Sequence, residues 1–273
     1  MAPTMSSAAK TLDLLTYFSA ARPEIGLTQL CRLAGRDKAT TYRYLQTLQE
    51  TGFVEQNPAT KHYRLGPALL HLAQLREKTV PRKYAAEMAV AELAEATGET
   101  AHVSVLSGDT VYPLTSCESP QHGTRAVIDI QTLPLHATAS GLCALAFGPE
   151  QLIDVALTNM TAFTATTPTT PEALNHAIRM ARQTGFAQSQ RSFEAEIHSI
   201  GAPVFDHTGH YAGSVNVACV ASRLTPELEY IITQHLVTAS RKITLNWGGT
   251  LPAAVTASWA ASPSRLSASE AVS

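Results

Sequence analysis

The chain has 273 residues, of which 45% are hydrophobic and 15% are charged. This length is sufficient for two domains, and the composition is typical of a folded globular protein. No run of about 18 apolar residues exists and no apolar stretch follows a basic start, so we expect neither a membrane span nor a secretory signal.

Charge is divided unevenly along the chain. The net charge is −2, but residues 1–80 carry 10 Lys/Arg and 6 Asp/Glu, whereas residues 81–250 carry 9 and 15. The first segment therefore has a net charge of +4 and the second a net charge of −6, as expected if only the first segment contacts the phosphates of DNA. The four cysteines form no CxxC pair, which predicts reduced thiols in the cytoplasm. We expect no metal and no cofactor.

The first elements form a helix-turn-helix pattern. Apolar residues at a spacing of three predict a helix over residues 7–21. Residues 28–45 predict two short helices separated by Gly35, which can take the left-handed conformation that ends a helix, and Asp37 can cap the second helix. In such a pair the second helix enters the DNA major groove. The residues expected to face the DNA from this region are Thr28, Lys38, Thr40, Thr41, Arg43 and Tyr44.

A wing is expected directly after the second helix. Residues 53–56 and 62–65 read as short strands around the turn cluster 57–60. In a winged helix, Lys61, His62 and Arg64 would lie against phosphates, which supply affinity more than specificity.

Pro67 can open a further helix, which we interpret as a linker between domains over residues 67–81. Leu69, Leu72 and Leu75 form a narrow stripe on it. The stripe is either a dimer seam or a surface that packs on the wing.

The rest of the chain alternates helices and strands, which indicates an α+β domain with an antiparallel sheet flanked by helices. Helices are expected over residues 82–97, 138–147, 149–157, 171–184 and 225–246. Strands are expected over residues 100–106, 110–115, 125–130, 186–190, 199–206 and 211–220. The Ala-, Ser-, Pro- and Thr-rich residues 249–273 are expected to be disordered.

These motifs carry a resemblance to the IclR family of bacterial transcription regulators. The N-terminal blocks that resemble its winged-helix domain are residues 7–15, Leu27-Thr28, 41–45, 52–54 and 63–66. The blocks that resemble its effector-binding domain, which has a GAF/PAS-like fold, are residues 135–141, 185–187, 202–206, 213–215 and 222–225. The resemblance implies a winged-helix domain over 1–66 and an effector-binding domain over 82–248. It also implies a homodimer or dimer of dimers that binds a double-stranded DNA operator.

The resemblance also implies a small-molecule effector, with a carboxylate or aromatic acid as the family-level expectation. Small residues open the helix near 138, where free N–H groups and the helix dipole favour an anion. The alternative is that Thr138 and Ser140 are only helix caps and Asn216 is only a satisfied polar side chain. The candidate effector-binding residues are His136, Thr138, Ser140, Gly141, Ser189, Ser199, Asn216 and Ala218.

An enzyme fused to a DNA-binding domain is the competing interpretation. The sequence has no Gly-x-Ser-x-Gly elbow, phosphate loop, HExxH or Gly-x-Gly-x-x-Gly. His136 and Ser140 could be a base and a nucleophile, but the sequence places no third group beside them. A purely architectural DNA-binding protein would have no use for a large acidic second domain. We therefore predict a ligand-responsive repressor or activator rather than an enzyme.

Overall fold

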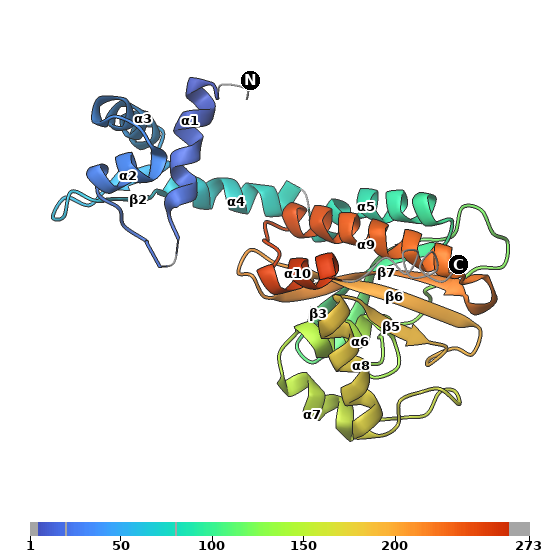
Figure 1. Cartoon of the computed structure of the whole chain (residues 1–273). Helices are drawn as coiled ribbons and strands as arrows, with labels where there is room; N and C mark the ends of the chain where they lie inside the picture. Colours follow the sequence, from blue (N-terminus) through green and yellow to red (C-terminus); the bar gives the residue numbers. More distant parts are fainter. Residues whose placement is uncertain (1–4, 20, 80, 262–273) are drawn as a thin grey trace, which may run out of the picture. The chain divides into compact units, whose positions relative to one another are not determined.

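The computed structural model describes residues 5–19, 21–79 and 81–261. The chain forms two compact units that divide between Pro81 and Arg82. Figure 1 shows the helices and strands of each unit. The predicted fold class, a helix-turn-helix followed by an antiparallel sheet flanked by helices, is confirmed.

The N-terminal unit is a helix-turn-helix with a two-stranded wing (Figure 1). Its elements are α1 (Ser7–Asp13), η1 (Leu14–Tyr17), α2 (Leu27–Ala34), α3 (Lys38–Glu50), β1 (Val54–Gln56), β2 (Tyr63–Leu65) and α4 (Pro67–Thr79). As predicted, Gly35 ends α2 with a left-handed φ of 61°. The Asp37 side chain caps α3 by accepting a hydrogen bond from the Thr40 N–H at 2.9 Å.

The core of this unit contradicts one prediction about α3. Thr41 and Tyr44 were expected to face outward, but they are 0% and 8% exposed and share the buried face with Leu45 and Leu48. Helical periodicity explains this, because positions 41, 44, 45 and 48 recur at spacings of three and four. The Thr41 hydroxyl donates to the Asp37 carbonyl at 2.9 Å, so it is part of the fold rather than of the outer surface.

Helix α4 differs from its neighbours because none of its described side chains is buried. Leu72 and Leu75 are 46% and 47% exposed. Within one chain, therefore, Leu72 and Leu75 do not pack on the wing, whereas Leu69, the first residue of the stripe, is half-buried.

The C-terminal unit is a five-stranded antiparallel sheet with strand order β4-β3-β7-β6-β5. Its strands are β3 (Thr100–Ser107), β4 (Thr110–Cys117), β5 (Ala187–Gln190), β6 (Ile197–Phe205) and β7 (Tyr211–Val220). Helices α5 (Arg82–Thr97) and α9 (Pro226–Asn246) cover one face, and α6 (Ala139–Phe147) packs on the other, with α7 (Gln151–Thr158) and α8 (Pro171–Thr184) beyond it (Figure 1). The short η2 (Ala221–Arg223) joins β7 to α9. Because both faces are covered, the central strand β7 is buried along nearly its whole length.

Two predictions for this unit are wrong. Residues 125–130 form no strand; they are an irregular segment in which Ala126 is buried and Val127 and Asp129 are exposed. A loop that lays alternate side chains on a core gives the same sequence pattern as a half-buried strand.

The predicted disordered tail is the second error, because Ala253–Ala261 forms helix α10. Its Trp259 is only 9% exposed, stacks on Phe186 at a centroid distance of 6.1 Å, and donates from Nε1 to the Gly185 carbonyl at 2.9 Å. Val255 of the same helix is 5% exposed, so two buried side chains fix a segment whose composition is otherwise typical of disorder. The remainder of that prediction, residues 262–273, lies outside the described residues. No helix in the described chain is long and apolar enough to cross a membrane.

Candidate DNA-binding surface and ligand pocket

The exposed face of α3 carries Lys38, Tyr42, Arg43 and Gln46. The predicted residue Thr40 is half-buried beside them. The Arg43 guanidinium lies 5.6 Å from the centroid of the Tyr44 ring, so the buried tyrosine supports the arginine from below. Tyr42 is 46% exposed and was missed, although its spacing of four from Lys38 and Gln46 places all three on one helical face.

An open groove brings four of the predicted DNA-facing residues together. Its lining combines the start of α2, the start of α3 and the wing, and includes Thr28, Lys38, Tyr42, Lys61 and His62. Cationic side chains on both sides of an open groove suit a phosphate backbone.

Arg64 is in a different situation from the other predicted phosphate contacts. Its Nε lies 2.6 Å from a Glu55 carboxylate oxygen, and its Nη1 lies 3.6 Å from Glu24. Glu24 also accepts hydrogen bonds from Asn57 and Thr60 of the wing turn, at 3.0 and 3.3 Å. The charge of Arg64 is therefore already neutralised by carboxylates that organise the wing.

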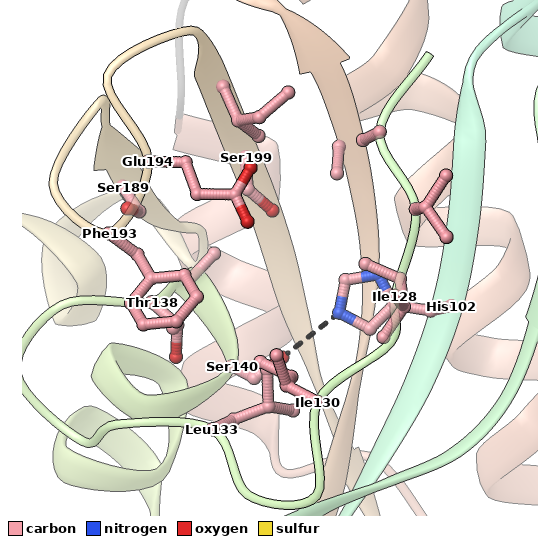
Figure 2. Close-up of a pocket in the computed structure, with 15 residues that line it drawn as sticks. His102, Ile128, Ile130, Leu133, Thr138, Ser140, Ser189, Phe193, Glu194 and Ser199 are labelled. Carbon is pink, nitrogen blue, oxygen red and sulfur yellow. Dashed lines mark hydrogen bonds between the residues drawn. The ribbon is translucent and has the colours of Figure 1, made fainter.

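The C-terminal unit contains a pocket between α6 and the sheet, with the irregular segment 126–133 as one wall. It holds about 550 Å³ of empty space, including the part open to solvent. Figure 2 shows side chains from the strands, α6 and two loops converging on it. The predicted effector residues that line it are Thr138, Ser140, Ser189, Ser199 and Ala218.

The other three candidates have structural surroundings of their own outside this lining. The fully buried Asn216 amide donates to the Ser214 carbonyl and hydroxyl, at 3.2 and 3.0 Å. Gly141 packs so closely on the turn before α6 that a Cβ would collide with the Leu135 backbone. His136 Nε2 lies 2.9 Å from the Thr161 carbonyl.

His102 on β3 is the principal pocket residue that the sequence did not indicate. It is 3% exposed, its Nε2 lies 3.2 Å from the Ser140 Oγ, and its Nδ1 has no hydrogen-bond partner in the described chain. Burial lowers the pKa of this imidazole to about 4, so it is neutral at pH 7. A signal was present, because His102 and Ser104 interrupt an apolar strand at a spacing of two and so share one face.

The loops supply the remaining unpredicted lining. Phe193 and Glu194 come from the connection between β5 and β6, and Ile128 and Leu133 come from the segment expected to begin with a strand. Loop residues carry no periodicity, so only the structure could bring them to the pocket.

An ion pair between the half-buried Arg223 and the buried Glu99 holds the segment that leads into the pocket wall. Arg223 donates from Nε and Nη2 to the two carboxylate oxygens of Glu99, at 2.7 and 2.6 Å, and from Nη1 to the Thr124 carbonyl at 2.9 Å. The Thr100 hydroxyl donates to the Ala126 carbonyl at 2.7 Å. The wall is therefore fixed at two points, one at Thr124 just before it and one at its first residue, Ala126.

The arrangement does not suit nucleophilic catalysis. Ser140 pairs with His102 rather than with His136, the partner considered from the sequence. A general base should have a pKa near the working pH and a group that orients it. His102 has a pKa of about 4, and its Nδ1 lacks an orienting partner among the described residues.

Comparison with known proteins gives one consistent result. The family model described as bacterial transcriptional regulator IclR C-terminal matches residues 79–245, and the IclR helix-turn-helix domain matches residues 7–58. The HTH-type transcriptional regulator XynR of Escherichia coli (strain K12) is 27% identical over 81% of this chain and 89% of its own length. The glycerol operon regulatory protein of Streptomyces coelicolor is 29% identical, covering 88% and 94%. A crystal structure of an IclR-type transcriptional regulator from Silicibacter sp. TM1040 has a TM-score of 0.84 and 42% identity, covering 92% and 99%.

Proposed function

The chain belongs to the IclR family of bacterial transcriptional regulators, and we propose that a small organic metabolite in the pocket of its C-terminal unit changes the affinity of its N-terminal unit for operator DNA. The observation that carries this proposal is the pocket itself. It is bounded mainly by apolar side chains with a few hydroxyls, one imidazole and one carboxyl group, which is the lining expected for a small-molecule site.

On the DNA side, the proposal assigns base contacts to the exposed residues of α3 and phosphate contacts to the groove. In this proposal Lys38, Thr40 and Arg43 read bases, supported by the exposure of Lys38 and Arg43 on α3, with Tyr42 beside them. Lys61 and His62 contact phosphates from the wing, supported by their place in the lining of the groove. Buried Thr41 and Tyr44 act by supporting this surface.

The proposed active form is a homodimer or a dimer of dimers. The exposed leucines of α4 support this, because a second chain would bury them. Paired recognition helices would also explain how a module that reads only a few base pairs selects an operator.

Regulation requires that the metabolite bind one arrangement of the protein better than another. The coupling is expected to be about 1–3 kcal/mol, or roughly a 5–150-fold change in operator affinity. By reciprocity, operator DNA should change the affinity for the metabolite by the same factor.

The test is a thermal-shift screen of small metabolites on the full chain, because a ligand that binds only the folded state raises the melting temperature. Each hit is repeated on Ser199→Phe, which should fill the pocket from a half-buried position. Hits that lose their effect in this variant are then titrated against operator DNA. The proposal fails if hits persist with Ser199→Phe, or if pocket-dependent hits leave operator affinity unchanged.

A further inference from the structure

The charge of the pocket lining is of one sign. Among the described lining residues there is no Lys or Arg, and the one acidic residue is Glu194, which is exposed at the edge of the pocket. Its carboxylate belongs to the loop between β5 and β6 and is drawn with Phe193 and Ser199 around the same hollow (Figure 2). An anionic ligand would meet a like charge here, whereas a cation would meet an opposite one.

Three of the four hydroxyl groups that line the pocket, those of Thr138, Ser189 and Ser199, offer acceptors rather than donors. Ser189 donates its hydroxyl hydrogen to the Ala137 carbonyl at 2.7 Å, and Ser199 donates to the Val217 carbonyl at 3.1 Å. Thr138 likewise donates to a backbone carbonyl, at 2.9 Å. A hydroxyl keeps two lone pairs after it has donated. A ligand that accepted a hydrogen bond from one of these hydroxyls would leave a buried carbonyl without its donor. A ligand that donates a hydrogen bond to the hydroxyl oxygens avoids this loss.

Two further side chains suit a ligand that has a hydrogen-bond donor attached to an apolar skeleton. His102 Nδ1 is buried and has no hydrogen-bond partner among the described residues, and it can accept a hydrogen bond when Nε2 carries the proton and donates to Ser140. In that tautomer the Ser140 hydroxyl hydrogen is the one donor that these side chains still offer. The ring of Phe193 lines the pocket next to Glu194, and an aromatic face attracts a cation that lies over it. Side chains such as Ile128 and Leu133 provide the apolar remainder.

We infer that this pocket selects an organic ammonium ligand, a protonated amine on a small apolar skeleton, with Glu194 as its charge partner and the Ser189 and Ser199 oxygens as acceptors. This inference rests on the proposed function, because it specifies the head group of the metabolite that the pocket would hold. It replaces the carboxylic acid that the family resemblance implied.

The N-terminus of α6 acts in the opposite direction. Its backbone dipole favours an anion near Thr138 and Ser140. A carboxylate placed there would share the pocket with Glu194 and would find the hydroxyl hydrogens of Ser189 and Ser199 already engaged. A carboxylate of matched size is therefore the sharpest competitor.

The test uses the full chain and three probes that share one aromatic skeleton: 2-phenylethylamine, 2-phenylethanol and phenylacetate. Affinities are measured by calorimetry at pH 7. The amine should bind about tenfold tighter than the acid, from the combined effect of the charge pair and the cation–π contact, with the alcohol between them. Glu194→Gln keeps the size of the side chain and removes its charge, so it should reduce the affinity for the amine several-fold and leave that for the alcohol unchanged.

Glu196→Gln is the matched control, because Glu196 is exposed on the same loop as Glu194 but does not line the pocket. It should leave all three affinities as they are. Equal or tighter binding of phenylacetate would overturn the inference while leaving the pocket as a metabolite site, as would an amine preference that survives Glu194→Gln. Failure of all three probes to bind at millimolar concentration would also overturn it. The metabolite screen with Ser199→Phe tests the proposed function independently of any of these results.

Discussion

The two units place their polar groups in opposite ways. In the N-terminal unit, Lys38, Arg43 and Lys61 are exposed, and the core below them is almost wholly apolar. In the C-terminal unit, Glu99 and His102 are buried and depend on neighbours in the fold. Exposed charges can change with little effect on stability and so are free to determine affinity, whereas a buried charge first affects folding. Substitutions in the two units should therefore differ in what they change.

The largest effect is expected for Arg223→Ala, which leaves the Glu99 carboxylate buried without its bidentate partner. The loss should be about 3 kcal/mol of unfolding free energy, because removing the main partner of a buried charge is strongly destabilising. The remaining neighbour of the Glu99 carboxylate is the more exposed His122 imidazole, at 3.7 Å. Lys242→Ala is the matched control, since it breaks a more exposed pair with Glu92 on the same unit. That loss should be under about 1 kcal/mol. Urea unfolding measures both, and equal losses would remove the distinction between buried and exposed charges.

The next effect is a dependence of stability on pH. His102 has a pKa of about 4 in the folded chain against about 6.5 when unfolded, so the unfolded chain binds more protons between these values. The neutral His102 side chain makes its full contribution to the unfolding free energy above pH 6.5. This contribution is lost as the pH falls towards 4. Between pH 7 and pH 5 the loss should be about 2 kcal/mol. Burial also lowers the pKa of His198, so the measurement compares the unfolding free energy of the wild type with that of His102→Gln. The two should converge as the pH falls, and parallel curves would contradict the assignment.

The two units also differ in how much of their structure could be predicted from the sequence. In the N-terminal unit, Gly35 and Asp37 act through local backbone chemistry, so the helix boundaries there could be predicted. The pocket wall could not be, because Ala126 and Ile128 produce an alternating pattern without joining the sheet. His102 depends on contacts between β3 and α6, which are far apart in the sequence. Trp259 shows the same limit, since its partners on Gly185 and Phe186 lie in a distant segment.

A smaller effect, on affinity rather than stability, is expected for Arg43→Ala. Arg43 is exposed on α3, and a bidentate arginine contact to a base contributes about 1–3 kcal/mol of discrimination. We expect a loss in the lower half of this range, which is roughly a tenfold decrease in operator affinity. The free energy of unfolding should not change. Gln49→Ala is the control, because Gln49 is exposed near the end of the same helix. Gel-shift titration measures both, and an unaltered affinity and sequence preference for Arg43→Ala would remove Arg43 from the reading surface.

The smallest effect distinguishes two cations of the wing. Lys61 faces the groove, and no carboxylate of the described chain forms an ion pair with it, whereas Arg64 is held by Glu55 and Glu24. A lysine that contacts a phosphate releases about one counterion on binding, so its removal should lower the salt slope of operator binding by about 1. Lys61→Asn is the suitable change, because the backbone φ of 60° at this position is one that Asn tolerates.

Arg64→Gln should alter the salt slope by much less than Lys61→Asn, because its guanidinium is already engaged with carboxylates rather than with phosphate. The two variants lose the same formal charge, so a purely long-range electrostatic effect would lower both slopes equally. Binding measured from 50 to 200 mM salt separates these cases. Equal slopes would mean that the Glu55 and Glu24 contacts release Arg64 on the DNA, and Arg64 would then be a further phosphate contact of the wing beside Lys61 and His62.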